Sequence, residues 1–237
     1  MPALLSIPLV LLAAALSASA CADDPAGPGS QTVQWEQVEW SGGTTNVAIL
    51  NPTDGSPGPH PVIFALPWGE GTGDLVLSFI QRYWGEEAPS RGYYVVAPAV
   101  RGTSMAEGAA ELIPEIFALM DAQLDYDASS VALVGASNGG RGIFHAALAH
   151  PGGFKTLVGL PGSYSGAAAD LTTLAGKRVR LLVGELDTGW EANSQATLAA
   201  LEAGRATASL NIIPGQGYAL SLNVATLMDE IDSALGR

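Results

Sequence analysis

The sequence predicts an α/β domain: a doubly wound, mostly parallel sheet of about eight strands, with helices on both faces and no lid domain. Short apolar runs that end in turn residues alternate with longer segments of helical spacing. This alternation is typical of strands that are buried on both faces. The 237 residues are 48% hydrophobic and 14% charged, which suits one compact domain with a large core.

Each element follows from its local pattern. Eight apolar segments are expected to be strands: 32–40, 44–52, 62–67, 93–99, 131–135, 156–160, 178–184 and 208–214. The first two are joined at Gly42-Gly43, which is a hairpin signal. Five segments have helical spacing: 74–87, 106–124, 138–150, 191–204 and 220–235. Pro114 is expected to kink the second of these helices. The sequence contains no internal repeat and predicts no second domain.

The first twenty residues are expected to lie outside the fold. Residues 1–20 carry no charged side chain and end in small residues before Cys21, as in a secretory signal peptide. The position of Cys21 resembles the lipid-modified cysteine of bacterial lipoproteins, although Ala18 stands where such signals usually have Leu. Two alternatives remain open: an ordinary signal peptide with an incidental cysteine, and an uncleaved anchor.

This interpretation divides the chain into a signal peptide (1–20), a lipid-anchor cysteine with a flexible tether (21–31) and a folded domain (32–237). The tether is rich in Asp, Pro and Gly. The expected location is the bacterial cell envelope, with the domain held on a membrane through Cys21. Without lipidation of Cys21, the protein is expected to be secreted.

Charge and composition exclude several classes of function. The 23 acidic and 10 basic side chains give a net charge of −13, which disfavours nucleic acid as a partner. The largest basic cluster is the segment 177–180. A single cysteine permits no intrachain disulfide and no cysteine-based zinc cluster. Three scattered histidines predict no metal site, and nothing indicates an organic cofactor.

The most informative motif is Gly-Ala-Ser-Asn-Gly-Gly at residues 135–140, directly after an expected strand and directly before an expected helix. The small residues permit a sharp turn that exposes the oxygen of Ser137 above the sheet. The N-terminus of the following helix favours developing negative charge at the same place. The alternatives are a glycine-rich turn with an incidental serine and a dinucleotide fingerprint, which fits less well because Ser137 occupies its middle glycine position.

On these residues the chain resembles the α/β-hydrolase family, in particular its lidless bacterial esterases, depolymerases and dienelactone-hydrolase-like members. The resemblance covers residues 33–235. It rests on the order of elements and on three segments: 131–140, Ala149-His150-Pro151 with Phe154, and 182–187. It implies a nucleophilic serine, then an acid, then a histidine along the chain.

The resemblance assigns Ser137 as the nucleophile and Asp187 as the acid, with Glu185 as a neighbour that competes for the second role. The histidine position, after the Pro-Gly-x-Gly run at 214–217, is occupied by Tyr218. The three histidines of the chain, His60, His145 and His150, all precede Asp187 in the sequence, and we expect them to lie away from the site. We interpret them as structural or surface residues.

Tyr218 is a poor substitute for a general base, because a phenol with the ordinary tyrosine pKa of about 10 is almost fully protonated at pH 7. The family's oxyanion segment reads Trp68-Gly69-Glu70-Gly71 here, so the backbone N–H groups of Glu70 and Asn138 are the candidate oxyanion-hole donors. The short connection 163–177 leaves no room for a lid. Trp68, Trp190 and Tyr218 are expected to line an open site for an apolar or planar group.

Three functional hypotheses follow. The first is a lipid-anchored relative of serine esterases with impaired catalysis, which binds a small-molecule ester or apolar ligand or acts as an accessory protein. The second is an active serine carboxylester hydrolase with an unconventional general base. The third is a structural envelope protein in which Ser137 has no role.

Overall fold

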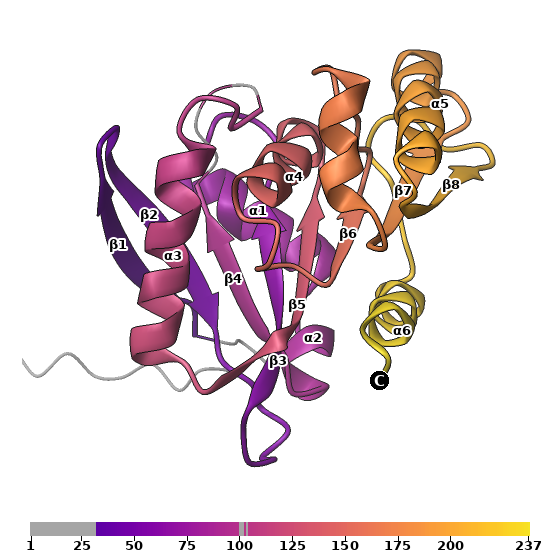
Figure 1. Cartoon of the computed structure of the whole chain (residues 1–237). Helices are drawn as coiled ribbons and strands as arrows, with labels where there is room; N and C mark the ends of the chain where they lie inside the picture. The colour runs from indigo at the N-terminus through magenta and orange to yellow at the C-terminus, as the bar shows by residue number, and fades with distance from the viewer. Residues whose placement is uncertain (1–31, 100–101, 103) are drawn as a thin grey trace, which may run out of the picture. The chain divides into compact units, whose positions relative to one another are not determined.

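The computed structural model describes residues 32–99, 102 and 104–237. In this part of the chain, eight strands form one sheet in the order β1-β2-β4-β3-β5-β6-β7-β8 (Figure 1). The strands are β1 (Gln34–Trp40), β2 (Gly43–Leu50), β3 (His60–Leu66), β4 (Tyr94–Pro98), β5 (Tyr126–Gly135), β6 (Thr156–Gly159), β7 (Arg178–Gly184) and β8 (Thr207–Ile213). The β1–β2 and β2–β4 pairs are antiparallel and all other pairs are parallel. The expected sheet is therefore confirmed in strand number and direction.

Helices cover both faces of the sheet. One layer contains α3 (Ala109–Gln123), α4 (Asn138–Ala149), the 3₁₀ helix η1 (Ala168–Leu174) and α5 (Thr188–Ala203). The other layer contains α1 (Gly73–Tyr83), α2 (Glu87–Ser90) and α6 (Val224–Leu235). The prediction of helices on both faces is confirmed.

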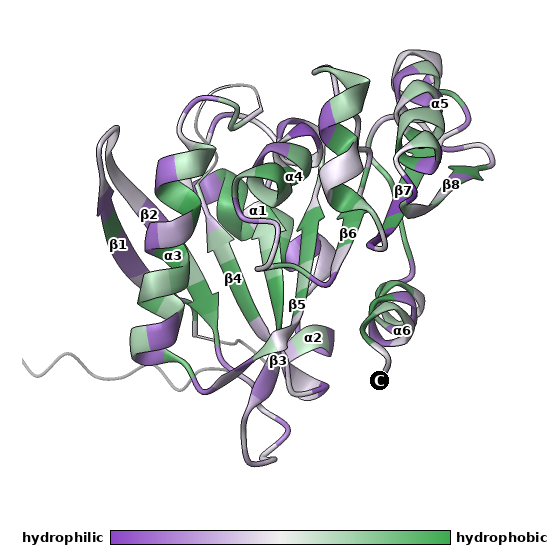
Figure 2. Ribbon diagram, in the orientation of Figure 1, coloured by the Kyte–Doolittle hydropathy of each residue, from purple (hydrophilic) through white to green (hydrophobic). Residues whose placement is uncertain are grey.

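Two apolar cores result from the alternation of side chains along each strand. In β3, Val62, Phe64 and Leu66 pack toward α3 and α4, whereas Ile63 and Ala65 pack toward α1 and α6. All five of these side chains are fully buried. The central strands are accordingly apolar along nearly their whole length (Figure 2), as expected for a sheet covered on both sides.

Capping side chains define where several helices begin. Thr72 Oγ1 accepts a hydrogen bond from Leu75 N at the start of α1. Asn223 Oδ1 accepts one from Thr226 N, so α6 begins at Val224 and not at residue 220 as expected. Caps of this type satisfy backbone donors that the first helical turn leaves free.

Three further boundaries differ from the sequence-based prediction. The helix expected over 74–87 is divided into α1 and α2, because the chain turns at Gly85 with φ of +40°. Helix α3 begins at Ala109 after Gly108, which has φ of +98°, and it runs continuously through Pro114. Strand β5 begins at Tyr126, five residues before the apolar run that predicted it, and its pairing with β3 changes register there.

The expected signal peptide, Cys21 and the tether lie outside the described residues. Within the described residues, the connection between β6 and β7 contains only η1, and no lid domain is present. No described helix combines the length and the apolar character needed to cross a membrane.

The start of α4 approaches the ends of two strands very closely. A Cβ atom on Gly139 would lie 1.9 Å from the carbonyl oxygen of Leu66, and one on Gly140 would lie 1.9 Å from that of Pro161. Both distances are far below van der Waals contact with backbone atoms that cannot move independently. The two glycines are therefore required for α4 to reach the position that it occupies.

We expect Gly139→Ala to lower the free energy of unfolding by about 3 kcal/mol or more, because overpacking against backbone forces the helix away from the sheet. The measurement is urea denaturation of the variant beside the native chain. The control is Gly152→Ala, where an added Cβ meets nothing within 4 Å and we expect a change below about 0.5 kcal/mol. Equal effects of the two substitutions would contradict this account.

Candidate functional site

Ser137 occupies a strained turn between β5 and α4. Its backbone has φ of 56° and ψ of −114°, a region that costs a non-glycine residue of order 1–3 kcal/mol. Two backbone hydrogen bonds hold this conformation: Ala136 N donates to Leu66 O at 3.1 Å, and Ser137 N donates to Pro161 O at 3.0 Å. The turn is thus tied to the ends of both flanking strands, β3 and β6.

Tyr218 contacts Ser137 directly. Its hydroxyl donates a hydrogen bond to Ser137 Oγ. Ser137 is only 8% exposed, whereas Tyr218 is 50% exposed, and both residues line the same cavity. The structure therefore brings together the first and the last of the three residues that the sequence motif points to.

The loops after β7 and β8 lie side by side, which places Asp187 near this pair in the fold. Leu186 N donates to Gln216 O at 2.8 Å, and a Cβ on Gly184 would lie 2.3 Å from Gly217 O. Asp187 directly follows Leu186 on the first loop, and Tyr218 directly follows Gly217 on the second. The ring centroids of Tyr218 and Trp190, in the first turn of α5, are 6.5 Å apart.

Asp187 has one oxygen in use and one without a partner. Oδ1 accepts a hydrogen bond from Trp190 N at 3.3 Å and so caps α5. Oδ2 is buried and has no hydrogen-bond partner. A buried carboxylate oxygen without a donor is unfavourable, so Oδ2 is the one side-chain oxygen of Asp187 that the surrounding structure leaves unsatisfied.

The loop after β3 forms the opposite wall. Asn138 Nδ2 donates to Gly69 O at 3.2 Å, which ties this loop to the first residue of α4. Glu70 is exposed to solvent, and neither it nor Asn138 is among the residues that line the cavity beside Ser137. Trp68 is half-buried and packs edge-on against Phe79, with ring centroids 5.2 Å apart.

A cavity of about 160 Å³ lies beside Ser137. It is lined by Trp68, Arg82, Tyr83, Ala136, Ser137, Leu160, Pro161, Tyr218 and Ala219. Most of these side chains are apolar or aromatic. The volume is below the range of about 300–1,000 Å³ that is typical for drug-sized ligands, so the cavity has room only for a small group.

Two arginines near the site were not singled out from the sequence. Arg82 lines the cavity, and its guanidinium donates to the carbonyl oxygen of Leu220 at 2.7 Å. Arg141 stacks over the Trp190 ring at 4.6 Å and its Nη1 donates to Asn138 Oδ1 at 3.4 Å. Arg141 lies one helical turn after Ser137, a spacing that indicates a shared helix face. Nothing local connects Arg82 to Leu220, which lies 138 residues later in the chain.

Trp190 does not line this cavity, although Trp68 and Tyr218 do. Tyr83 was also missed: burial raises the pKa of its phenol, and its hydroxyl donates to Leu220 O at 3.2 Å. Tyr83 and Arg82 thus hold the segment that follows Tyr218. Their contacts position the phenol that contacts Ser137.

None of the three histidines bonds to Ser137 or Tyr218. His60 begins β3, at the opposite edge of the sheet, and its Nδ1 lies 2.9 Å from Gly92 O. The His145 ring lies 5.5 Å from that of Tyr164, and burial lowers its pKa. The His150 ring lies 4.6 Å from that of Phe117. Each histidine therefore has a structural neighbour and no place in this site.

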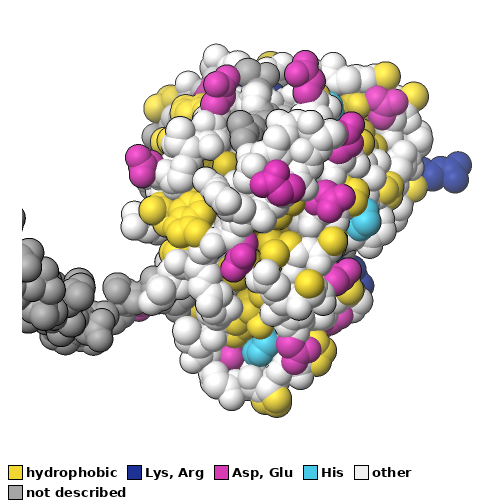
Figure 3. Space-filling view, turned by 90° about the vertical axis from the view of Figure 1, so that its left-hand side faces the viewer, with side chains coloured by type: hydrophobic (Ala, Val, Ile, Leu, Met, Phe, Trp, Pro, Cys, Tyr) yellow, Lys and Arg dark blue, Asp and Glu magenta, His cyan; other side chains and the backbone are white. Residues whose placement is uncertain are grey.

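Among the described residues, no group of three or more His, Cys, Asp or Glu side chains is arranged to hold a metal ion. Acidic side chains are spread over the face shown in Figure 3, and the few basic ones on it lie at its rim.

Comparison with solved structures gives the fold a name. A thermostable esterase superposes with a TM-score of 0.67 at 16% identity, over 86% of this chain and 62% of the esterase. The S-formylglutathione hydrolase of Agrobacterium tumefaciens has a TM-score of 0.64 at 18% identity, over 88% and 95% of the two chains. The chain has the α/β-hydrolase fold.

Other α/β-hydrolase-fold structures agree. An esterase from Pyrobaculum calidifontis has a TM-score of 0.64 at 14% identity, over 88% of this chain and 86% of its own. The chain spans 62% of the length of the thermostable esterase and 36% of that of a dipeptidyl peptidase 4 from Porphyromonas gingivalis. No family model and no curated protein sequence matches the chain.

The α/β-hydrolase fold confirms the architecture expected from the motif at 135–140. It also accounts for the position of the site: the ends of parallel strands meet at one edge, and the turn after β5 projects there.

Two substitutions of Asp187 separate its role as the cap of α5 from the effect of its charge. We expect Asp187→Ala to lower the free energy of unfolding by about 1 kcal/mol, because the cap of α5 is lost. Asp187→Asn keeps an oxygen for Trp190 N and is expected to cost only a few tenths of a kcal/mol. Thermal unfolding followed by circular dichroism measures both. Destabilisation by Asn as large as that by Ala would show that the charge of the carboxylate, and not the cap, stabilises this loop.

Proposed function

We propose that the protein is an α/β-hydrolase-fold envelope protein in which serine catalysis is impaired, and that it binds a small ester or apolar ligand in the cavity beside Ser137. The observation that carries this proposal is the hydrogen bond from the Tyr218 hydroxyl to Ser137 Oγ. It puts a phenol hydroxyl where a serine hydrolase has the imidazole base.

Attack by a serine requires that its proton be accepted as the new bond forms. A phenol hydroxyl is a much weaker proton acceptor than an imidazole, so it does not replace the histidine as a general base. In serine hydrolases, loss of the triad histidine costs about 10⁶ in turnover, nearly as much as loss of the whole triad. We therefore expect at most slow, background-level turnover.

Ligand binding does not require the base. The cavity of about 160 Å³ keeps aromatic walls at Trp68 and Tyr83, and Asn138 remains at the N-terminus of α4. Backbone donors at this position favour a carbonyl or carboxylate oxygen. A short acyl group with its carbonyl at Ser137 fits both the size and the polarity of this site.

A second candidate is an active serine carboxylester hydrolase in which Tyr218 serves as the base. One observation favours it: Ser137 retains the strained backbone of a nucleophile, with φ of 56°, although a residue without function is free to relax such strain. In that case Tyr218, as a phenolate, accepts the serine proton while Ser137 Oγ attacks the ester carbonyl. The alcohol then leaves with that proton, and water hydrolyses the acyl-enzyme to release the acid and restore Ser137.

The proposed location is the bacterial cell envelope. Residues 1–20 act as a signal peptide, and Cys21 carries the lipid that holds the domain on a membrane; without lipidation the domain is secreted. This part of the proposal rests on the sequence pattern at residues 1–21 alone.

Hydrolysis of p-nitrophenyl acetate tests the proposal. We expect the native chain to hydrolyse this ester no faster than Ser137→Ala, because no group accepts the serine proton. Quenching of tryptophan fluorescence by butyrate measures ligand binding in the same samples, since Trp68 lines the cavity. Saturable quenching that is lost in Trp68→Phe supports binding at this site.

The matched control for catalysis is Tyr218→Phe, which removes one oxygen and keeps the ring. Turnover that disappears in both Ser137→Ala and Tyr218→Phe would overturn the proposal in favour of the active hydrolase. Turnover that survives in Ser137→Ala would place the activity outside this site.

A further inference from the structure

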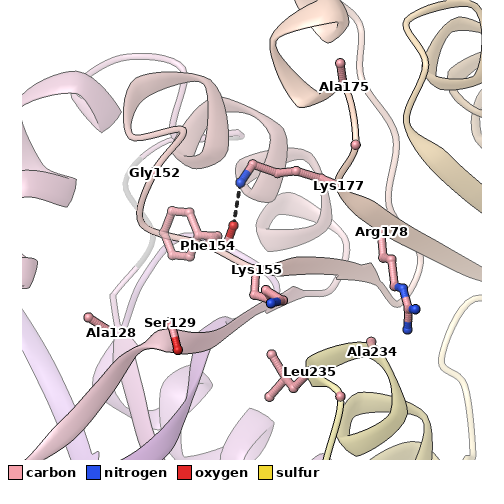
Figure 4. A pocket seen from close by; sticks show the side chains of 12 residues that line it. Ala128, Ser129, Gly152, Phe154, Lys155, Ala175, Lys177, Arg178, Ala234 and Leu235 are labelled. Carbon is pink, nitrogen blue, oxygen red and sulfur yellow. Dashed lines mark hydrogen bonds between the residues drawn. The ribbon is translucent and has the colours of Figure 1, made fainter.

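A second cavity lies at the opposite edge of the sheet from Ser137. It has a volume of about 620 Å³ and lies where β6 and β7 begin, beside the C-terminal end of α6 (Figure 4). Lys155 directly precedes β6, and Lys177 and Arg178 stand at the start of β7. Because parallel strands begin at one edge and end at the other, this cavity is separated from Ser137 by the length of the sheet.

The charge of this cavity is unlike that of the rest of the chain. The sequence has 23 acidic and 10 basic side chains and only two lysines, and both lysines line this cavity together with Arg178. None of the lining residues is Asp or Glu. Three positive charges thus gather in one concave place on a protein of net charge −13.

These cations have no acidic partners among the described residues. Arg91, Arg180 and Arg237 all form ion pairs, whereas none is formed by Lys155, Lys177 or Arg178. Lys177 Nζ donates to the carbonyl oxygen of Phe154 at 2.6 Å, as Figure 4 shows. Arg178 Nη1 donates to Ser233 O at 2.8 Å. Carbonyl oxygens orient both side chains but neutralise neither.

The lysines are close enough to affect each other. Burial lowers the pKa of Lys177, and the positive charge of Lys155 lowers it further. Asp127, nearby in sequence to the lining residue Ser129, has its carboxylate engaged by Ser129 and Ser130. Like charges held together without a counter-ion are unfavourable, and a bound anion removes that cost.

We propose that this cavity binds a phosphate group, carried by a small phosphate ester or by a phospholipid headgroup. A phosphate carries about −1.5 to −2 charge at pH 7 and accepts hydrogen bonds in several directions, and two ammonium groups and one guanidinium are among the side chains that line this cavity. The volume also leaves room for an organic group beside the phosphate. The site is independent of Ser137 and of the function proposed above.

Because the chain has only two lysines, labelling lysine with ¹³C at Cε gives NMR signals that both report on this cavity. We expect both signals of the full chain to shift saturably with inorganic phosphate at constant ionic strength. Lys155→Gln and Arg178→Gln should each weaken the affinity about fivefold, as expected for the loss of one partly exposed charge.

Arg205→Gln removes the same charge from an exposed residue outside the cavity lining, and it should change the affinity less than about twofold. Co-sedimentation with vesicles identifies the source of the phosphate. Stronger binding of the native chain than of Lys155→Gln to phosphatidylglycerol vesicles, but not to phosphatidylcholine vesicles, indicates a headgroup. A response to free phosphate alone indicates a soluble ester.

Two results together overturn the proposal. The first is that the lysine signals shift equally in chloride and in phosphate, and the second is that the native chain and Lys155→Gln bind vesicles equally. The proposal is also overturned if Arg205→Gln weakens binding as much as Lys155→Gln does. Melting curves of each variant show that it is folded, so a lost response is not a lost structure.

Discussion

The contact between the start of α4 and the ends of β3 and β6 supports the rest of the site. Gly139 meets the backbone of Leu66 and Gly140 meets that of Pro161 with no space for a side chain at either position. The same two carbonyl oxygens accept the N–H groups of Ala136 and Ser137. The strained backbone of Ser137, its burial and the position of the helix N-terminus all depend on this contact. A helix held even slightly farther from the sheet would relax the turn and withdraw the serine.

The other part of the site is the loop after β8. Arg82 and Tyr83 of α1 bind the carbonyl oxygen of Leu220, and this contact fixes the segment that carries Tyr218. The Tyr218 hydroxyl is hydrogen-bonded to Ser137 Oγ. On the neighbouring loop, Oδ2 of Asp187 is buried without a hydrogen-bond partner.

The sequence patterns that predicted the fold were local ones. Fully buried parallel strands such as β3 and β7 are recognisable because both of their faces demand apolar side chains, and the turn at 135–140 is recognisable because its glycines are required sterically. Helix boundaries that depend on a single residue were harder to predict from the sequence: Asn223 caps α6 and so shortens it, and the turn at Gly85 interrupts the first predicted helix. Ser137, Asp187 and Tyr218 were located from motif order. Arg82, Tyr83 and the basic cavity depend on contacts between distant segments, which no local pattern reveals.

The distribution of charge separates the two ends of the sheet. At the strand ends, Ser137 lies in a small cavity with mostly apolar and aromatic walls. At the strand beginnings, both lysines and Arg178 surround a larger cavity without acidic side chains. A net charge of −13 predicts no anion-binding surface. This sum over the whole chain does not reveal that three basic side chains line one cavity. The two cavities thus differ in ligand chemistry as well as in position.

The most direct measurement of the central claim is ester hydrolysis by Tyr218→His, which puts an imidazole in place of the phenol that contacts Ser137. If only the base is absent, p-nitrophenyl acetate turnover should rise about 10²-fold or more above that of the native chain. The gain should depend on Ser137 and should increase through about pH 6.5 as the imidazole loses its proton. A folded Tyr218→His chain that is no faster than the native one would contradict the claim that this substitution is what impairs catalysis.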